Sequence, residues 1–206
     1  SVKNTRKKIE PIAVDSSFTQ GIINYCHVYA KNLCMPLWTG ATVIRKSVFE
    51  EENGFNPVLK LGEDFDLWIR VALRYPVVFL NMPLANYNQD VELSGRAVGN
   101  MQHPYAHMIW NLDYLATVEK SNSELKQLLD NLRVYNLLPY FLNPEYRELA
   151  IRELDKVDWG KQPLKEKLRY NTPVAVLKLL RKVQIVGSKI KQSIIRIFVY
   201  RANATI

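Results

Sequence analysis

The distribution of hydrophobic residues divides the chain into a first half with mixed strands and helices and a second half with helices alone. Short β-branched runs predict buried strands at 41–45 and 77–80, and the second strand has a candidate hairpin partner around 84–88. A longer apolar stretch predicts a helix over about 18–33. The Ser-x-x-Glu sequence at 47–50 has the form of a capping box and predicts the start of a short helix.

Every segment after about residue 100 has the pattern of helices separated by short breaks. The expected helices lie at about 104–119, 121–136, 144–156, 173–186 and 189–200. The first half shows too few strands for a sheet with both faces covered, which indicates an incomplete α/β domain. We therefore expect such a domain over 1–100, a helical extension over 101–166 and a basic amphipathic helical tail over 167–206.

The strongest helical pattern follows Gly62 and begins with three carboxylates, Glu63, Asp64 and Asp66. The positive end of a helix dipole favours ionised acids in the first turn, and an ionised carboxylate on a rigid helix can serve as a general base. The spacing of Asp66 and Arg70 predicts an ion pair along the helix. Acids at a helix start often have a purely structural role. The neighbouring segments therefore have to distinguish a structural role from that of a general base.

Charge is unevenly distributed along the chain, whose net charge is +8. Residues 1–166 carry 19 basic and 20 acidic side chains, whereas 167–206 carry nine basic side chains and no acid. The tail repeats apolar residues at helical spacing, as at Ile190, Ile194 and Ile197, beside lysines and arginines. A basic amphipathic helix of this kind binds the surface of an anionic membrane, or else packs on the domain and leaves its basic face in water.

Other features bear on location and ligands. No apolar run is long enough to cross a bilayer and the N-terminus lacks the layout of a signal peptide, so we expect a cytoplasmic protein, placed at the inner face of the membrane if its tail binds lipid. Nucleic-acid binding is not expected, because the tail has few aromatic residues among its charges and no recognised motif. His103 and His107 have the spacing of a metal-binding pair without the rest of a H-E-x-x-H pattern, which favours packing or surface exposure over metal binding. Cys26 and Cys34 are expected to be free thiols.

The first half contains three stretches in a distinctive order: Trp38-Thr39-Gly40-Ala41-Thr42-Val43-Ile44-Arg45-Lys46-Ser47-Val48-Phe49, Asn53-Gly54-Phe55-Asn56 and Gly62-Glu63-Asp64-Phe65-Asp66-Leu67-Trp68-Ile69-Arg70. This order resembles the second half of the catalytic domain of family-2 glycosyltransferases. In that family a strand ending in arginine precedes a short helix and a Gly-Phe turn, and a Glu-Asp motif then opens a helix. The resemblance covers about 38–95, and it implies an α/β fold with a partial GT-A-like mixed sheet, followed by an all-helical segment.

The resemblance also implies a reaction, the inverting transfer of a sugar from a nucleotide-sugar to an acceptor hydroxyl in surface-glycan biosynthesis. Asp64 would be the base that takes the proton of the attacking hydroxyl, and Glu63 would position it or contact the acceptor. Thr39 and Gly40 would line the acceptor side, where a small residue allows close approach of the backbone. The acceptor would be a glycan or a lipid-linked sugar. Trp68 could stack on a sugar, but its place in an apolar helix favours core packing.

Two departures from the family concern the donor and the metal. The family binds its donor with an N-terminal βαβ half that ends in a metal-binding Asp-x-Asp, and no such half precedes residue 38 here. Asp64-Phe65-Asp66 matches that string but opens a helix, so it belongs to the Glu-Asp motif. Asn88-Gln89-Asp90 stands where the family often has an arginine and a histidine, which leaves Asp90 as a candidate metal ligand. We therefore expect a divalent metal, Mn²⁺ or Mg²⁺, with ligands mostly outside this chain, and no sugar transfer by this chain alone.

A second interpretation belongs to a different functional class. The chain would be a non-enzymatic module that associates with membranes or binds a partner, and that retains a remnant of the GT-A fold. A donor-binding half with its own Asp-x-Asp, encoded upstream or in a partner chain, would distinguish the enzyme from the remnant.

Overall fold

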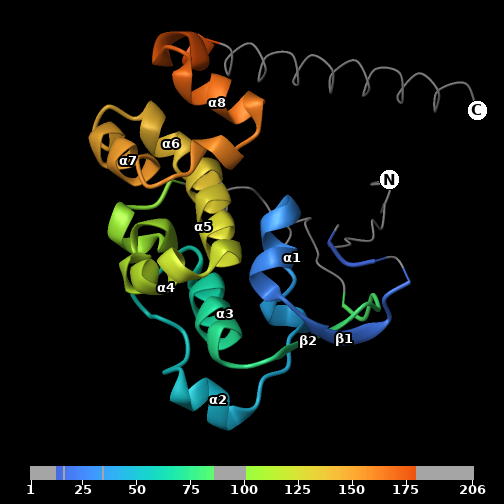
Figure 1. The fold of residues 1–206 in the computed structure, drawn as a ribbon. Helices are drawn as coiled ribbons and strands as arrows, with labels where there is room; N and C mark the ends of the chain where they lie inside the picture. The colour runs from blue at the N-terminus through green and yellow to red at the C-terminus, as the bar shows by residue number, and fades with distance from the viewer. Residues whose placement is uncertain (1–12, 16, 34, 86–100, 180–206) are drawn as a thin grey trace, which may run out of the picture. The chain divides into compact units, whose positions relative to one another are not determined.

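The computed structural model describes residues 13–15, 17–33, 35–85 and 101–179. The contacts of the chain group it into two compact units, Ser1–Asp158 and Trp159–Ile206. The described residues are mostly helical with a small two-stranded antiparallel sheet, which confirms the mixed α/β class in outline (Figure 1). The predicted domain boundaries near residues 100 and 166 stay predictions. Asp90, Cys34 and the helix predicted at 189–200 lie outside the described residues.

The sheet consists of β1 (Gln20–Ile23) and β2 (Val77–Leu80), which pair in antiparallel orientation. β2 confirms the strand predicted at this position. The helix predicted over 18–33 is wrong in its first part, because pairing with β2 holds the β1 residues in a strand. The helix that does form is α1 (Tyr25–Asn32), and Asn24 caps its N-terminus through its side-chain oxygen.

The segment 41–45 is not the buried strand that the sequence predicts. η1 (Thr39–Ala41) is a single 3-10 turn, and the chain then runs extended through Thr42, with φ −119° and ψ 136°. No strand among the described residues pairs with this segment, and the Val43 side chain is 99% exposed. The β-branched sequence favours the backbone conformation of a strand, but burial requires a neighbouring strand.

α2 (Lys46–Glu51) and α3 (Glu63–Arg74) follow in the chain. The capping box predicted at 47–50 is wrong, because its serine already lies inside α2. α3 confirms the predicted helix, and its apolar residues supply much of the core; those that are buried are Phe65, Leu67, Trp68, Ile69 and Val71. Trp68 is only 3% exposed, which agrees with core packing.

The continuous helix predicted over 104–119 is broken into short pieces. These are η3 (Pro104–Ala106), η4 (Met108–Trp110), η5 (Asp113–Leu115) and α4 (Ala116–Ser121). The backbone N–H of Lys60 donates to the carbonyl oxygen of Ala106 at 2.7 Å, and the N–H of Met108 donates to that of Leu61 at 3.0 Å. These bonds use backbone groups that a continuous helix would need for itself.

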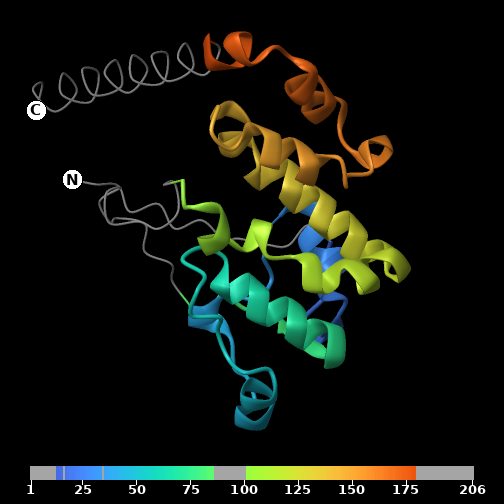
Figure 2. The ribbon, with the colours of Figure 1, turned by 90° about the vertical axis from the view of Figure 1, so that its left-hand side faces the viewer.

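α5 (Ser123–Asn136) is the longest described helix and confirms the helix predicted there. Asn122 caps it by accepting two backbone N–H groups, and its leucines enter the core: Leu125, Leu128, Leu129 and Leu132. α1 packs along α5, as do α6 (Leu138–Leu142) and α7 (Arg147–Leu154) further along the chain (Figures 1 and 2). α7 confirms the central part of the helix predicted over 144–156. Helices from both halves of the sequence therefore share one core.

The second unit contains η6 (Trp159–Lys161) and α8 (Leu164–Asn171). A further helix begins after Pro173, as predicted, and is described as far as residue 179. The hydrophobic pattern does not predict α8, whose sequence has few apolar residues. No helix within the described residues is long and apolar enough to cross a membrane.

A buried charge network joins α4, α5 and α7. Arg133 of α5 is 2% exposed and donates to both carboxylate oxygens of Glu119, and it also lies near Asp130 at 3.4 Å and Glu153 at 3.8 Å. Burial by itself raises the pKa of Glu119, but the hydrogen bonds and charges of Arg133 and Lys126 outweigh it, so the pKa lies below its ordinary value. The network therefore depends on Arg133.

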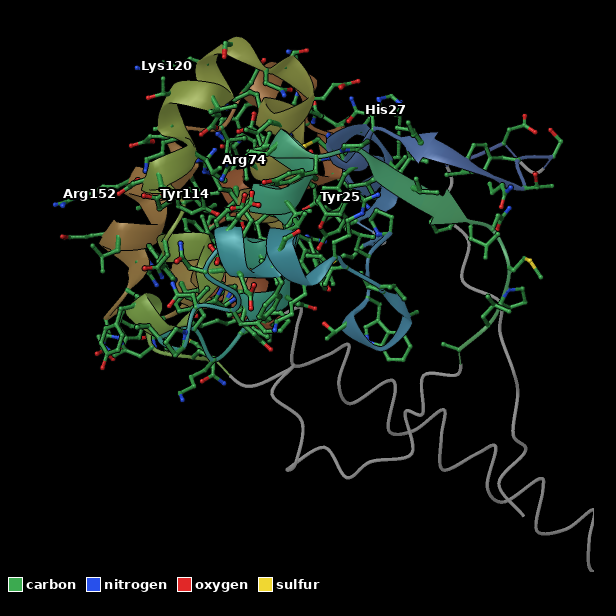
Figure 3. All side chains as sticks on the ribbon, turned by 90° about the horizontal axis from the view of Figure 1, so that it is seen from below. Tyr25, His27, Arg74, Tyr114, Lys120 and Arg152 are labelled. Atoms are coloured by element: carbon green, nitrogen blue, oxygen red, sulfur yellow. The ribbon has the colours of Figure 1, made fainter. Side chains whose placement is uncertain are left out.

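Replacing Arg133 by alanine (Arg133→Ala) should lower the free energy of unfolding by about 3–5 kcal/mol, because buried carboxylates lose their counter-charge. Urea unfolding followed by circular dichroism measures the change. Arg152→Ala is the matched control, since the Arg152 side chain points outward from α7 (Figure 3) and its loss should cost less than about 0.5 kcal/mol. Equal losses in the two variants would contradict a special role for Arg133.

Candidate functional site

Gly62 fixes the point at which α3 begins. Its backbone has φ 84° and ψ 19°, and an added Cβ would lie 2.2 Å from the Cγ atom of Met108. Met108 cannot easily move away, because its backbone N–H is hydrogen-bonded to the carbonyl oxygen of Leu61. Glycine satisfies both the left-handed conformation and the close approach. Glu63 and Asp64 are therefore the first two residues of a helix with a fixed start.

Asp64 has an altered acidity because of its surroundings. Its side chain is half-buried, and its Oδ1 accepts the backbone N–H of Phe65 at 2.7 Å. Burial raises the pKa of Asp64 above its ordinary value; the hydrogen bond from Phe65 acts in the opposite direction, and the Glu63 carboxylate adds to the rise. Burial thus outweighs the effects that favour the ionised form at a helix start. Asp64 binds a proton more tightly than an exposed aspartate does.

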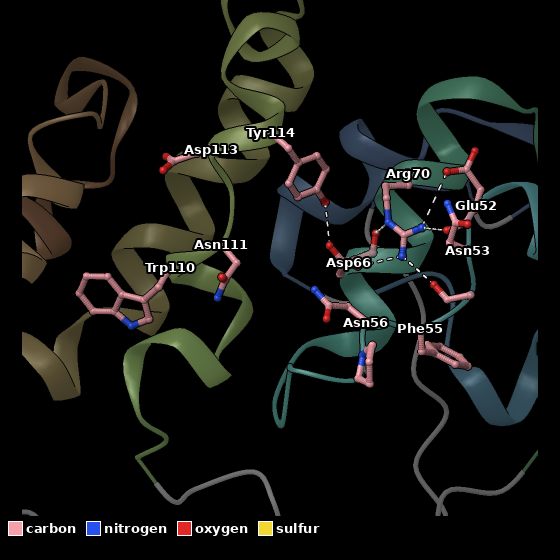
Figure 4. Close-up of a pocket in the computed structure, with 12 residues that line it drawn as sticks. Glu52, Asn53, Phe55, Asn56, Asp66, Arg70, Trp110, Asn111, Asp113 and Tyr114 are labelled. Carbon is pink, nitrogen blue, oxygen red and sulfur yellow. Dashed lines mark hydrogen bonds and ion pairs between the residues drawn. The ribbon is translucent and has the colours of Figure 1, made fainter.

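Asp66, one position beyond Phe65 in α3, has a structural role (Figure 4). Its Oδ2 pairs with Nη2 of Arg70 at 2.8 Å, which confirms the predicted pair, and its Oδ1 accepts the hydroxyl of Tyr114 at 3.0 Å. Arg70 also donates to backbone carbonyl oxygens of the turn at 52–54. In the part of the chain that the structure describes, Asp64 has no ion pair. Of these two aspartates, Asp64 is therefore the one available for chemistry.

Tyr25 is an electrostatic neighbour of Asp64 that sequence reasoning missed. Tyr25 is labelled in Figure 3. Its side chain is 2% exposed, and its hydroxyl has no hydrogen-bond partner among the described residues. Burial raises the pKa of Tyr25 well above its ordinary value, and charges on Tyr29, Cys26 and Asp64 add to the rise. A tyrosine in an apolar stretch belongs to no recognisable motif. Only the packing of α1 against α3 brings it close to Asp64.

Thr39 and Gly40, the predicted acceptor-side residues, lie in the exposed turn η1. A Cβ on Gly40 would lie 2.7 Å from the ring of Trp38, so a side chain here would displace the tryptophan. The hydroxyl of Thr42 donates to the carbonyl oxygen of Trp38 at 2.7 Å within this segment. Among the described residues, no hydrogen bond joins Thr39 to Glu63 or Asp64, which are neighbours at the start of α3.

The described residues contain no group of three or more His, Cys, Asp and Glu side chains that could hold a metal ion. His107 is buried, and its Nδ1 accepts the backbone N–H of Ile109 at 3.1 Å. Burial lowers the pKa of His107 to about 4, so its ring is neutral at pH 7. His103 lies at the surface beside Tyr105, with ring centroids 4.1 Å apart. His107 is therefore packed in the core and His103 is exposed at the surface. Cys26 is a buried free thiol as predicted.

A polar pocket of about 620 Å³ lies beside Asp66 (Figure 4). Its walls are the turn at 52–57, Asp66 and Arg70 of α3, and parts of the segment 110–114. The turn and α3 belong to stretches that carry the family resemblance, whereas 110–114 is distant in the sequence and belongs to no recognised motif. The pocket forms because Arg70 and Asp66 hold the turn and Tyr114 on two sides of the same helix end.

Comparison of the chain with protein-family models, with curated proteins and with solved structures gives no match. The resemblance to family-2 glycosyltransferases therefore depends on the residues of 38–95 alone. What the site can do chemically follows from its own geometry, above all from the position and acidity of Asp64.

Gly62→Ala should lower the free energy of unfolding by about 2–4 kcal/mol. A side chain in the left-handed conformation costs roughly 1 kcal/mol, and the collision with Met108 adds about 1–3 kcal/mol. Urea unfolding measures the loss. In a double-mutant cycle with Met108→Ala, the two changes should couple by about 1 kcal/mol or more, because the second removes the Cγ atom nearest to the added Cβ and leaves only the Cβ of residue 108, at 2.8 Å. Strictly additive losses would show that the Met108 side chain beyond its Cβ is not the obstacle.

Proposed function

We propose that this chain is the acceptor-side part of an inverting glycosyltransferase of surface-glycan biosynthesis, with a GT-A-like fold similar to that of family 2. The observation that carries the proposal is Asp64, a half-buried carboxylate with a raised pKa at the fixed start of α3. A general base works best when its pKa lies closer to the working pH than that of an ordinary aspartate. The resemblance of 38–95 supplies the reaction, and the acidity of Asp64 supports its role in it.

The proposed reaction is a single displacement. The oxygen of the acceptor hydroxyl forms a bond to the anomeric carbon of the donor sugar, and its proton passes to the carboxylate of Asp64. The bond between the anomeric carbon and the diphosphate oxygen breaks, and the nucleoside diphosphate leaves with the electron pair. Because the new bond forms on the face opposite to the leaving group, the configuration at the anomeric carbon is inverted.

The remaining predicted residues have supporting roles in the proposal. Glu63 raises the pKa of Asp64 through its charge and contacts the acceptor, while Thr39 and Gly40 line the acceptor side from an exposed turn. The described residues do not fit a divalent metal, so no step is assigned to Mn²⁺ or Mg²⁺ here. In the proposal the metal would be held together with the nucleotide-sugar donor, by ligands that lie mostly outside this chain.

An exposed apolar face of the sheet supports the need for such a half. Ile22 and Val78 lie opposite each other in the register of the two strands and are 69% and 65% exposed. Contiguous apolar surface of this kind marks an interaction site. In the proposal the donor-binding half covers this face; a non-enzymatic partner-binding module would use the same face for another protein.

Asp64→Asn should lower the rate of sugar transfer by about 10²–10⁴-fold, because the amide cannot accept the proton of the acceptor hydroxyl. The assay uses the complete transferase that contains this chain and measures the nucleoside diphosphate released from a panel of nucleotide-sugars. The wild-type rate should also fall as the pH is lowered, because protonation of Asp64 removes the base. This fall should occur at a higher pH than the one at which an ordinary aspartate is protonated, because the pKa of Asp64 is raised.

The control for this prediction is Asp155→Asn, which removes an exposed carboxylate at the end of α7 and should leave the rate unchanged. The Asp64 variant should not unfold more easily at pH 7. A raised pKa means that ionisation of the folded carboxylate is unfavourable, so stability is lost as pH rises through that pKa, and the uncharged amide avoids this loss. Full transfer activity in the Asp64 variant would reject the base assignment.

An exposed apolar and basic surface on the second unit supports the membrane part of the proposal. Leu164 and Leu168, one turn apart on α8, are 70% and 59% exposed. Residues 159–179 carry five basic side chains and one acid, Glu166, which pairs with Arg169. In the proposal this surface continues into the basic tail, whose last part lies outside the described residues, and binds anionic lipid at the inner face of the membrane.

Replacing Leu164 and Leu168 together by aspartate should reduce binding to anionic vesicles by about tenfold or more, since two apolar side chains no longer enter the lipid. Co-sedimentation of the full chain with phosphatidylglycerol-containing vesicles measures the bound fraction. Leu149→Asp, at an exposed position of α7, is the matched control and should bind like the wild type. Equal binding of the wild type to uncharged phosphatidylcholine vesicles would contradict the charge-based mechanism.

A further inference from the structure

The pocket beside Asp66 has no part in the proposed transfer step (Figure 4). Arg70 is the one basic side chain among the described residues that line it. Arg70 donates to the backbone carbonyl oxygens of Glu52, Gly54 and Asp66, and its charge is balanced by the Asp66 carboxylate. The lining therefore offers no free positive charge, and its carboxylates repel anions. A phosphate or a nucleotide does not fit this pocket.

Uncharged polar groups line the same space. Oδ1 of Asn56 accepts the backbone N–H of Val58 at 3.0 Å, which leaves its Nδ2 hydrogens without partners in the described part of the chain. Asn111 has the opposite arrangement: its Nδ2 donates to two backbone carbonyl oxygens and its Oδ1 remains an acceptor. The hydroxyl of Tyr114 donates to Asp66 and can accept a further hydrogen bond. The pocket thus presents neutral donors and neutral acceptors together.

Aromatic rings supply apolar surface next to these groups. Phe55 and Tyr114 are 37% and 48% exposed, and Trp110 is partly exposed. A sugar ring matches this combination, because its hydroxyls both donate and accept hydrogen bonds while its C–H faces pack on aromatic rings. The volume of the pocket is also in the range of small-molecule sites.

We propose that this pocket binds an uncharged saccharide unit. Its binding depends on the amides of Asn53 and Asn56, the carbonyl of Asn111 and the exposed ring of Tyr114. The assignment of this saccharide unit to the acceptor glycan rests on the proposed transferase function. The acceptor would then be recognised at a neutral sugar bound on a different side of α3 from Asp64.

The test is an NMR titration of the full chain with the methyl glycosides of glucose, galactose and mannose and with N-acetylglucosamine. Concentrations should reach roughly 10 mM, because a weak site has a Kd on the order of 1 mM. At least one of these sugars should shift the indole signal of Trp110 and the side-chain amide signals of Asn56. UDP and inorganic phosphate should not shift them. The proposal is overturned if UDP or phosphate shifts these signals, or if none of the sugars does.

Asn56→Asp is the decisive variant. Its carboxylate still accepts the N–H of Val58 but lacks the Nδ2 donors, so the saccharide Kd should rise by roughly tenfold. Asn53→Gly removes a second amide without backbone strain, since Asn53 has φ 57°. Asn143→Asp is the matched control, because its Oδ1 accepts the N–H of Glu145 in the same kind of turn and does not line the pocket. An unchanged Kd in both pocket variants, or an equal loss in the control, overturns the proposal.

Asp64→Asn separates this inference from the transferase proposal. The variant should lose transfer in the complete enzyme and should bind the saccharide as the wild type does, because Asp64 does not line the pocket. Saccharide binding at the pocket without any transfer by the complete enzyme would uphold the pocket and reject the transferase. Transfer without any saccharide response at the pocket would reject the pocket alone.

Discussion

The guanidinium of Arg70 couples three segments that are distant in the sequence. It donates to the carbonyl oxygens of Glu52 and Gly54, pairs with Asp66 in its own helix, and through Asp66 is linked to Tyr114. A guanidinium withdrawn from water needs both hydrogen-bond acceptors and a counter-charge. The turn, the helix and the segment around Tyr114 therefore hold their positions together, and the apolar face of α3 anchors this arrangement in the core.

The same constraint separates the roles of two neighbouring carboxylates. Asp66 faces Arg70 and has a structural role, whereas Asp64 lies about 200° away around the helix, since each residue advances by about 100°. At that position burial, and not a cation, determines acidity, and the pKa of Asp64 rises. One rigid helix start thus provides both a structural carboxylate and a stronger base. The proposed transfer chemistry depends on this separation.

The proposed interaction surfaces differ in chemistry. The sheet exposes Ile22 and Val78, which a protein surface can cover, and α8 exposes leucines among lysines, which suits an anionic lipid surface. The pocket beside Asp66 combines neutral amides with aromatic rings, which suits a sugar. In the proposals, a donor-binding half, the membrane and the acceptor therefore meet three different parts of the chain.

α3 with its buried face and the Asp66–Arg70 pair could be predicted from the sequence, because both depend on the local spacing of residues along one helix. The sequence also pointed to Asp64, although only as an acid at a helix start. The tertiary structure decided what depends on distant segments. Pairing with β2 converts the start of a predicted helix into β1, and hydrogen bonds from 60–61 break the helix predicted over 104–119. The raised pKa of Asp64 and the pocket likewise arise from burial and from contacts between segments that no local pattern encodes.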